Sequence, residues 1–397
     1  MKYKTRFFAF FATMIVFNLA ANFAHPVTPT VIQELHLHDY MFGVALASMM
    51  ITNFLMSPFW GKINVYISSR MSLLICCCGY GIAQLWFAFA TTELMIILAR
   101  MFAGLFTGGI FVSFLTYVVN VSKPEDQAKY LTYSATIQSV ASAFGYMIGG
   151  FIGEFSVKAA FLTQAATLFV VAVLFYVICI PDAQAGMKIT GKQLAKEANP
   201  FQAFMDSRKF MCVAFALLFL VNILINFANT GFDQAFNYYL KDQLGLTSSY
   251  NGIIKAAVGF VAFISNMTLC IWIINKTNVR KSMAVLVSVC AAAALGTTIS
   301  VNIGIFIAFS VLVYAGYSVS IPVLQNMVAG QAKPEQKNLV MGFFNATKSL
   351  GSIAGSLTAG FIYSVNAKLP FACTCVIYSA GIIAAIGYLL YRKDRKA

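Results

Sequence analysis

The sequence predicts an all-α membrane protein in which twelve transmembrane helices form two pseudo-symmetric halves of six helices each. Of its 397 residues, 60% are hydrophobic and only 10% are charged, and the mean hydropathy is +0.78. Soluble domains carry about 25% charged residues, so this much apolar surface requires lipid. Apolar stretches of about 20 residues, the length that crosses a bilayer as a helix, recur between short polar breaks.

The second half of the chain repeats the first at an offset of about 210 residues. The leading helices match at a slightly shorter offset. Two related membrane halves around a central path are the architecture of a secondary transporter. The matched positions are Lys123-Pro124-Glu125 with Lys333-Pro334-Glu335, Gly145 with Gly355, Gly150-Phe151-Ile152 with Gly360-Phe361-Ile362, and Asn18, Asn22, Phe23 and Ala24 with Asn222, Asn226, Phe227 and Ala228.

Each half contains six candidate spans in order. The N-terminal half, residues 1–180, and the C-terminal half, residues 210–397, are joined by a polar segment, 181–209, expected to be a cytoplasmic linker and partly an amphipathic helix. The N-terminal stretch lacks a small-residue cleavage site and is expected to be a retained first helix. The spans lie near 7–31, 41–60, 71–90, 94–118, 131–153 and 159–180, and near 210–240, 251–274, 282–301, 303–329, 338–364 and 370–391.

The basic residues of the loops set the orientation, because cytoplasmic loops carry an excess of Lys and Arg. With a cytoplasmic N-terminus, the outer face receives only Lys158, Lys241 and Lys368, and three bases lie within spans. Both termini are therefore expected in the cytoplasm, and the net charge of +14 reports topology. The cytoplasmic bases are Lys2, Lys4, Arg6, Lys62, Arg70, Lys123, Lys129, Lys188, Lys192, Lys196, Arg208, Lys209, Lys276, Arg280, Lys281, Lys333, Lys337, Arg392, Lys393, Arg395 and Lys396.

The sequence contains no sign of a cofactor or of an enzymatic centre. The nine cysteines lie in or at the ends of apolar runs without metal-ligand spacing, and are expected to be small core residues. There is no phosphate-binding loop, so transport driven by ATP is not expected. We expect no cofactor, no metal and no enzymatic activity. The expected partners are a small-molecule substrate, protons and the lipid bilayer, with no nucleic acid, and the chain is expected to be a monomer.

The motifs of this chain resemble, over essentially its whole length, those of the major facilitator superfamily and, within it, the twelve-helix bacterial drug:proton antiporters. Ser57-Pro58-Phe59-Trp60-Gly61 followed by Arg70 is similar to the loop between helices 2 and 3 that marks the superfamily. Leu98-Ala99-Arg100 with Gly104 is similar to its helix 4 arginine motif. Gly145 with Gly149-Gly150 resembles the glycine-rich helix 5 motif of the antiporters, and Phe232-Asp233 resembles a position where several exporters carry a proton-coupling acid.

The chain also departs from these patterns at four positions. The helix 2–3 loop normally has an acid where this chain has Val65 and a glycine where it has Ser68. The helix 5 motif normally continues with proline, and here Tyr146 follows the glycine. Some relatives have a second acid in helix 10, where this chain has Ser318. The resemblance therefore implies the fold more firmly than it implies antiport.

Two charged residues inside predicted spans are candidates for proton coupling. Asp233 is the one carboxylate placed in a span away from a clear loop, and an acid at a helix centre costs about 3 kcal/mol on insertion scales. The alternative is a snorkelling acid near the outer end of its helix. Arg100 must face protein or a water-filled cavity. By resemblance it couples protonation to substrate release or contacts the substrate; the alternative is a structural arginine bonded to helix-end carbonyls.

A lysine in helix 11 suggests a different substrate. Lys348 lies near mid-membrane and has Gln138 as its repeat partner. It can bind an anionic group, titrate, or form a structural ion pair with Asp233, and some organic-anion carriers of the superfamily have a similar lysine, by resemblance only. Lys255 lies nearer a helix start and is expected to snorkel outward. His25 is expected to be a core or helix-end histidine.

Rows of asparagine follow one face of each leading helix. Asn18 and Asn22 lie four residues apart, and Asn222, Asn226 and Asn229 lead to Asp233. They are expected to bind substrate in a cavity, with Gln138; hydrogen bonding between helices is the alternative. Gly61, Arg70, Gly145, Gly149 and Gly150 are expected to serve conformational gating. Six aromatic residues can add walls to the cavity, although each one taken singly is expected to be a core or lipid-facing residue: Tyr80, Phe111, Tyr133, Tyr238, Tyr314 and Tyr317.

These observations predict a secondary active transporter of the bacterial cytoplasmic membrane that moves a small organic solute by alternating access. Proton-coupled efflux of amphipathic or drug-like compounds is the first hypothesis. The alternative is an organic-anion or metabolite carrier, because three bases and one acid lie within the membrane spans. A membrane sensor or embedded enzyme is a further possibility without a supporting motif.

Overall fold

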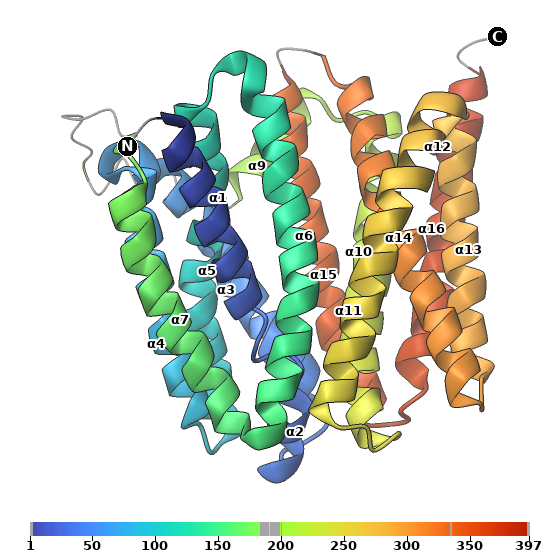
Figure 1. Ribbon diagram of the computed structural model, residues 1–397. Helices are drawn as coiled ribbons and strands as arrows, with labels where there is room; N and C mark the ends of the chain where they lie inside the picture. The colour runs from blue at the N-terminus through green and yellow to red at the C-terminus, as the bar shows by residue number, and fades with distance from the viewer. Residues whose placement is uncertain (1–2, 183–189, 191–198, 200, 334–335, 395–397) are drawn as a thin grey trace. The chain divides into compact units, whose positions relative to one another are not determined.

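The computed structural model describes residues 3–182, 190, 199, 201–333 and 336–394, and these residues fold as helices with no strand (Figure 1). Ten helical runs are long and apolar enough to cross a membrane. Two further helices complete the twelve predicted spans. One is the apolar stretch Thr5–Ala20, and the other is the helix Lys337–Tyr363, which has several polar residues. The predicted all-α, twelve-helix fold is confirmed.

The six spans of the N-terminal half lie close to their predicted positions. Most helices extend a few residues beyond the apolar stretch that revealed them, because helical hydrogen bonding continues into the membrane–water interface. The helices are α1 (Tyr3–Ala20), α2 (Thr28–Glu34), α3 (Met41–Ile67), α4 (Ser69–Ala88), α5 (Glu93–Val121), α6 (Pro124–Phe155) and α7 (Val157–Ile178).

The C-terminal half follows the same plan. The eighth span is built from three consecutive pieces, of which the middle one, Asn266–Cys270, is a π-helical turn. The elements are α9 (Gln202–Asp206), the 3₁₀ turn η1 (Ser207–Lys209), α10 (Val213–Asp242), α11 (Ser248–Ser265), the π turn η2 (Asn266–Cys270), α12 (Ile271–Lys276), α13 (Val279–Ile299), α14 (Ile303–Gln331), α15 (Lys337–Tyr363) and α16 (Leu369–Asp394).

The first span is interrupted, although the sequence predicted one helix over 7–31. α1 ends at Ala20, residues 21–27 form turns, and α2 begins at Thr28. Pro26 lacks the N–H that a continuing helix needs and disfavours the helical conformation of the residue before it. Pro29 lies in the first turn of α2, where proline is tolerated. The interruption leaves backbone carbonyls of the preceding turn for side chains to bind.

The described chain folds into two compact units. Unit 1 contains 1–37, 48–200 and 240–259, and unit 2 contains 38–47, 201–239 and 260–397. In unit 1, α4 packs against α5 and α7, and α1 packs against α6 and α7 (Figure 1). In unit 2, α13 packs against α14 and α16. Since α13, α14 and α16 are the repeat equivalents of α4, α5 and α7, the packing follows the internal repeat.

Glycines bring the helices of each unit into backbone contact. A Cβ atom on Gly145 or Gly149 of α6 would collide with the carbonyls of Leu19 and Phe23. In α15, Gly351 and Gly355 are packed in the same way on Ile223 and Phe227 of α10. Gly150 faces the Ser248 carbonyl. Small residues permit such close approach in membranes, which explains the glycine spacing in the sequence.

The predicted linker, 181–209, is described only in part. Residues 183–189, 191–198 and 200 lie outside the described residues. The remainder contains the helical turns α9 and η1. The division into an N-terminal half, a linker and a C-terminal half stays a prediction from the repeat.

Candidate transport site

Asp233 of α10 lies in unit 2, beside the hydroxyl of a buried tyrosine. The Tyr314 hydroxyl of α14 donates to Asp233 Oδ1 at 2.9 Å, and the Asp233 side chain is only partly buried. Gln234 Nε2 is 3.5 Å from the other carboxylate oxygen, too far for a strong bond. A phenol can donate to a carboxylate or accept from a carboxylic acid, so this pair can accommodate both protonation states of Asp233.

Two asparagines of the predicted row on α10, Asn222 and Asn226, connect helices. Asn222 Nδ2 donates to the Phe344 carbonyl at 2.8 Å and to Thr347 Oγ1 at 3.0 Å, both on α15. The Tyr317 hydroxyl donates to Asn226 Oδ1 at 2.9 Å. Both asparagines are 0% exposed, whereas the buried Asn229 Oδ1 has no partner. The interhelical alternative therefore describes these contacts of Asn222 and Asn226, and substrate binding by the row stays a prediction.

Lys348 on α15 has an exposed side chain. Among the described residues an ion pair joins Lys209 and Asp206, and none joins Lys348 to Asp233. The structural ion pair that the sequence left open is not formed in this conformation. A cation placed at membrane depth without an acid is a candidate for binding an anionic group.

In unit 1, Arg100 is 4% exposed and its guanidinium is only partly satisfied. Its Nη2 donates to Thr28 Oγ1 at 3.2 Å, and its Cζ lies 4.5 Å from the ring centroid of Phe87. The Nε atom has no hydrogen-bond partner. The hydrogen bond to the first residue of α2 ties Arg100 to the interrupted first span.

The buried side chains of Gln164 and Tyr80 bind the backbone of the interrupted segment between α1 and α2. Gln164 Nε2 donates to the Ala21 carbonyl and to the Tyr80 hydroxyl, both at 3.1 Å. Tyr80 in turn donates to the Ala21 carbonyl at 3.3 Å. The buried Oε1 atoms of Gln84 and Gln164 have no partner. The sequence analysis missed both glutamines, although an uncharged amide inside an apolar span was a visible signal.

Lys255 does not snorkel outward as expected. Its side chain is 7% exposed, and Nζ lies 5.7 Å from the ring centroid of Tyr146. The ring of His25 stacks on Tyr146 at 5.3 Å between centroids and 14° between planes. α11 comes this close to α6 because Gly252 lies against the Tyr146 carbonyl, where a Cβ atom would approach to 2.6 Å.

The remaining predicted substrate residues of unit 1 are less distinctive. Asn18 is 2% exposed and donates to the Met14 carbonyl of its own helix at 2.8 Å. Asn22 donates to the Asn18 carbonyl at 2.8 Å and is half-buried. Gln138 is half-buried in the middle of α6. Nothing in these contacts selects a substrate, and their role stays a prediction.

Two of the predicted gating residues lie on either side of the junction between α3 and α4, Gly61 in α3 and Arg70 in α4. The Arg70 guanidinium lies 5.0 Å from the ring centroid of Tyr176 on α7. Gly61 has room for a methyl group, since the nearest atom to an added Cβ is Val112 Cγ1 at 3.6 Å. The carboxylate of Asp182 accepts from Ser69 N at 2.7 Å and Ser69 Oγ at 2.6 Å. Asp182 thus supplies an acid at the start of α4.

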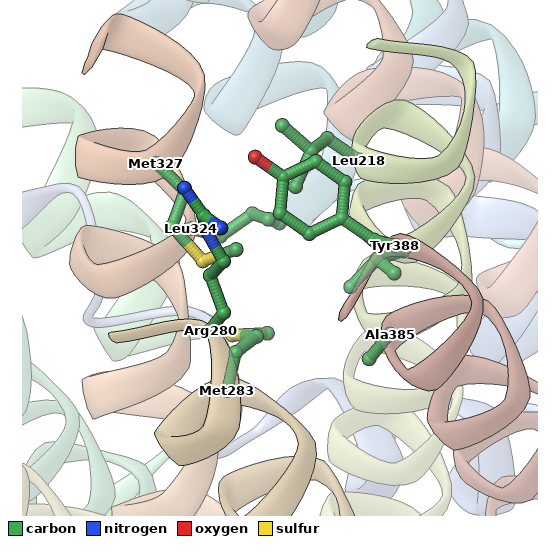
Figure 2. A pocket seen from close by; sticks show the side chains of 8 residues that line it. Leu218, Arg280, Met283, Leu324, Met327, Ala385 and Tyr388 are labelled. Carbon is green, nitrogen blue, oxygen red and sulfur yellow. The ribbon is translucent and has the colours of Figure 1, made fainter. Parts of the chain in front are cut away.

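Unit 2 contains an equivalent of this arginine at the start of α13. Arg280 and Tyr388 point toward each other across a small gap between α10, α13, α14 and α16 (Figure 2). The gap is too narrow to admit water, so it is side-chain packing and not a solute site. The other lining residues are Leu218, Val221, Met283, Leu324, Met327 and Ala385.

A wider depression of about 340 Å³ lies in unit 1 beside the ends of α2 and α6. Its charged lining residues, Glu34, Glu154 and Lys241, include both signs, and the two carboxylates are exposed. In the described residues, no group of His, Cys, Asp or Glu is placed to hold a metal ion. The depression does not select a ligand by charge.

Comparisons with known proteins agree with this architecture. The sequence model of the Major Facilitator Superfamily matches residues 7–304 and 218–397. Multidrug resistance protein 1 of Bacillus subtilis is 22% identical over 91% of this chain and 91% of its own length. The staphyloferrin B transporter of Staphylococcus aureus is 27% identical over 81% of this chain and 76% of its own. The quinolone resistance protein NorA of the same species is 20% identical over 96% of both chains.

Solved structures share the fold at low sequence identity. The bacterial homologue of the human lysosomal transporter Spinster, in an inward-facing and occupied conformation, gives a TM-score of 0.76 at 12% identity, covering 99% of this chain and 97% of that one. The human organic anion transporter MFSD10 gives a TM-score of 0.70 at 15% identity, covering 97% and 100%. With the repeat, the helix order and the family match together, this multi-pass membrane protein belongs to the Major Facilitator Superfamily of transporters.

Proposed function

We propose that this transporter exports amphipathic organic solutes in exchange for protons, and that Asp233 carries the proton. The observation that supports this most directly is the partly exposed carboxylate inside an apolar span, held by the Tyr314 hydroxyl. The relatives named as multidrug and quinolone resistance proteins support the solute class and the direction.

In this mechanism, Asp233 exchanges a proton with whichever side of the membrane its partly exposed carboxylate faces. The Tyr314 hydroxyl keeps a hydrogen bond in both protonation states because it can donate or accept. Protonation from outside and release toward the cytoplasm then accompany each outward movement of solute. Arg100, in unit 1, contacts the solute or couples its release to protonation of the transporter.

The location follows from the charge pattern. We place the protein in the cytoplasmic membrane of a bacterium, as a monomer with both termini in the cytoplasm, because the loops predicted on that side carry most of the Lys and Arg. The tightly packed glycines, Gly145, Gly149 and Gly150, give smooth helix contacts along which helices can slide during alternating access. Gly61 in α3 and Arg70 in α4 lie on either side of the helix junction that this movement would rearrange.

The proposal is tested by uptake of ethidium into proteoliposomes with an acidic lumen. Protons leaving the lumen should drive the dye inward, and Asp233→Asn should reduce this uptake to the rate of protein-free liposomes. Asp242→Asn, at the end of the same helix, is the control and should retain uptake. Gradient-driven uptake by a correctly inserted Asp233→Asn variant at the wild-type rate would remove Asp233 from the mechanism.

The second candidate is an organic-anion carrier, and the exposed Lys348 without an ion pair favours it. The family neighbour described as an organic anion transporter shows that the fold accommodates this chemistry. Lys348→Gln should then abolish transport of an organic acid such as pyrenebutyrate, whereas Lys368→Gln, which changes a loop base, should not. Unchanged acid transport in Lys348→Gln would rule out this role.

A further inference from the structure

The interruption between α1 and α2 brings several functional groups together inside unit 1. Residues 21–27 leave the helix, and the Ala21 carbonyl is bound by Tyr80 and Gln164. Irregular backbone at membrane depth is tolerated where protein or a water-filled cavity surrounds it. Interrupted helices in transporters commonly line binding sites for this reason.

Arg100 approaches this segment as a buried cation without an acid. Its five N–H donors form a fixed fork, of which the described contacts use one, to Thr28. The buried Nε atom has no partner, and Arg100 takes part in no ion pair among the described residues. A desolvated guanidinium is stabilised by an anion that accepts two parallel hydrogen bonds, as a carboxylate does.

A second base lies against the same group of side chains. Lys255 is buried on α11 with its Nζ 5.7 Å from the Tyr146 ring centroid. The Tyr146 ring stacks on His25 of the interrupted segment, and Arg100 is hydrogen-bonded to Thr28, which directly follows that segment. Two bases near this segment provide cationic groups that can bind an acidic group.

An apolar surface adjoins the bases. The Phe87 ring lies under the Arg100 guanidinium, 4.5 Å from its Cζ, and stacks on Phe161 at 4.7 Å. A solute with an acidic group and an aromatic or aliphatic body would therefore meet complementary chemistry on both sides of Arg100. Tyr146 stands where the resembling motif has proline, so this arrangement is a feature of this chain.

We propose that Arg100, Lys255 and Tyr146, around the interrupted segment 21–27, form a subsite for the acidic group of an amphipathic organic anion or zwitterion. The inference deepens the proposed transport function and rests on it for the role of the subsite as a solute site. It is separate from the anion role considered for Lys348, because all its residues belong to unit 1.

Equilibrium binding of two fluorescent probes to the purified, full-length protein in detergent tests the subsite. 1-Pyrenebutyrate has a carboxylate, and 1-pyrenebutanol has the same body without the charge. The wild-type protein should bind the acid about tenfold or more tightly than the alcohol, the usual effect of a hydrogen bond to a charged group. Lys255→Gln and Arg100→Gln should each remove most of this preference, and Lys255→Arg should restore it.

The control variant is Lys158→Gln, which changes an exposed base of the same unit and should keep the preference for the acid. Lys348→Gln in unit 2 is the variant that separates the two candidate anion sites, and the subsite predicts that it keeps the preference. Equal binding of acid and alcohol by the wild-type protein overturns the proposal. A preference lost in Lys348→Gln and kept in Lys255→Gln also overturns it, and assigns the acidic group to unit 2.

Competition distinguishes a solute from a lipid head group. Displacement of pyrenebutyrate by soluble aromatic acids supports a solute subsite, whereas displacement by phosphatidylglycerol alone overturns it in favour of a lipid site. Binding at equilibrium needs no proton gradient. If Asp233→Asn still takes up ethidium but the protein binds the acid more tightly than the alcohol, the proposed coupling is wrong and the subsite stands. If Asp233→Asn loses ethidium uptake but acid and alcohol bind equally, only the subsite is wrong.

Discussion

At the scale of single residues, Ser68 has a backbone conformation that side chains rarely adopt. Its φ is 69° and its ψ is 149°, a region occupied almost only by glycine, which costs other residues about 1–3 kcal/mol. The motif that this loop resembles has glycine there. The chain has therefore kept the backbone shape of the motif while losing its glycine, and the sequence comparison had located the position without showing the strain.

We expect Ser68→Gly to raise the free energy of unfolding by about 1 kcal/mol, since the relief of strain exceeds the entropy that glycine adds to the unfolded chain. The Ser68 side chain makes no capping hydrogen bond that would be lost. Thermal unfolding in detergent measures the change. Ser156→Gly is the control. Its hydroxyl caps α7 by accepting from Ala159 N, so this variant should be destabilised; a lower melting temperature for Ser68→Gly would contradict the strain argument.

The charged residues of the candidate site were visible in the sequence because a charge inside an apolar span is rare. Asp233, Arg100 and Lys348 were found in this way. Their partners were not, since Tyr314 and Thr28 approach only through helix packing. Lys255 was misjudged because its distance from the helix start suggested the interface, whereas the contact of Gly252 with α6 buries it.

At the scale of elements, the start of α4 depends on an acid from a distant part of the chain. Asp182 accepts two hydrogen bonds from Ser69 and one from Asn120 Nδ2 at 3.1 Å. A carboxylate at a helix N-terminus satisfies free N–H groups and interacts with the helix dipole. It therefore anchors the end of α7 to α4 and α5.

Asp182→Ala should lower the free energy of unfolding by about 1 kcal/mol, the usual value of a helix N-cap. Asp182→Asn should have a smaller effect, because an amide oxygen still accepts from Ser69 N. Thermal unfolding should give melting temperatures that fall in the order wild type, Asp182→Asn, Asp182→Ala. Equal stability of wild type and Asp182→Ala would show that this contact contributes nothing.

The close contact of helix α15 with helix α10 leads to a second prediction. A Cβ atom on Gly355 would collide with the backbone of Phe227, so Gly355→Ala should destabilise the protein by about 1–3 kcal/mol through overpacking. Gly342, on the same helix, has nothing within 4 Å of an added Cβ. Gly342→Ala should therefore be neutral or slightly stabilising. The unfolding temperatures of the two variants test this, and an equal change in Gly355→Ala and Gly342→Ala would refute the packing argument.

The spans themselves were predictable to within a few residues, because each helix that crosses the lipid needs an apolar stretch of about 20 residues. Two local features were not predicted. The first span was read as continuous despite Pro26 and Pro29, although both prolines were visible. The π turn at Asn266–Cys270 has no proline or glycine to announce it, and it arises within a run that still reads as one apolar span.

At the scale of the whole molecule, the internal repeat carried the prediction of the fold. The equivalent packing of α4 and α13 within their units confirms it. The packing also refines the alignment: Leu19 and Ile223, which follow the matched Asn18 and Asn222, lie against Gly145 and Gly351. The sequence match of Gly145 with Gly355 is thus one helical turn away from the packing match. Periodic glycines permit such a shift, and only contacts resolve it.

The central claim, that solute moves in exchange for protons, is tested most directly by proton counterflow. Proteoliposomes containing a pH-sensitive dye, with valinomycin and potassium to clamp the membrane potential, receive ethidium outside and no imposed pH gradient. The account predicts that the lumen becomes alkaline as ethidium enters, and that Asp233→Asn abolishes this change. Ethidium entry through the protein with an unchanged or acidified lumen would contradict exchange for protons.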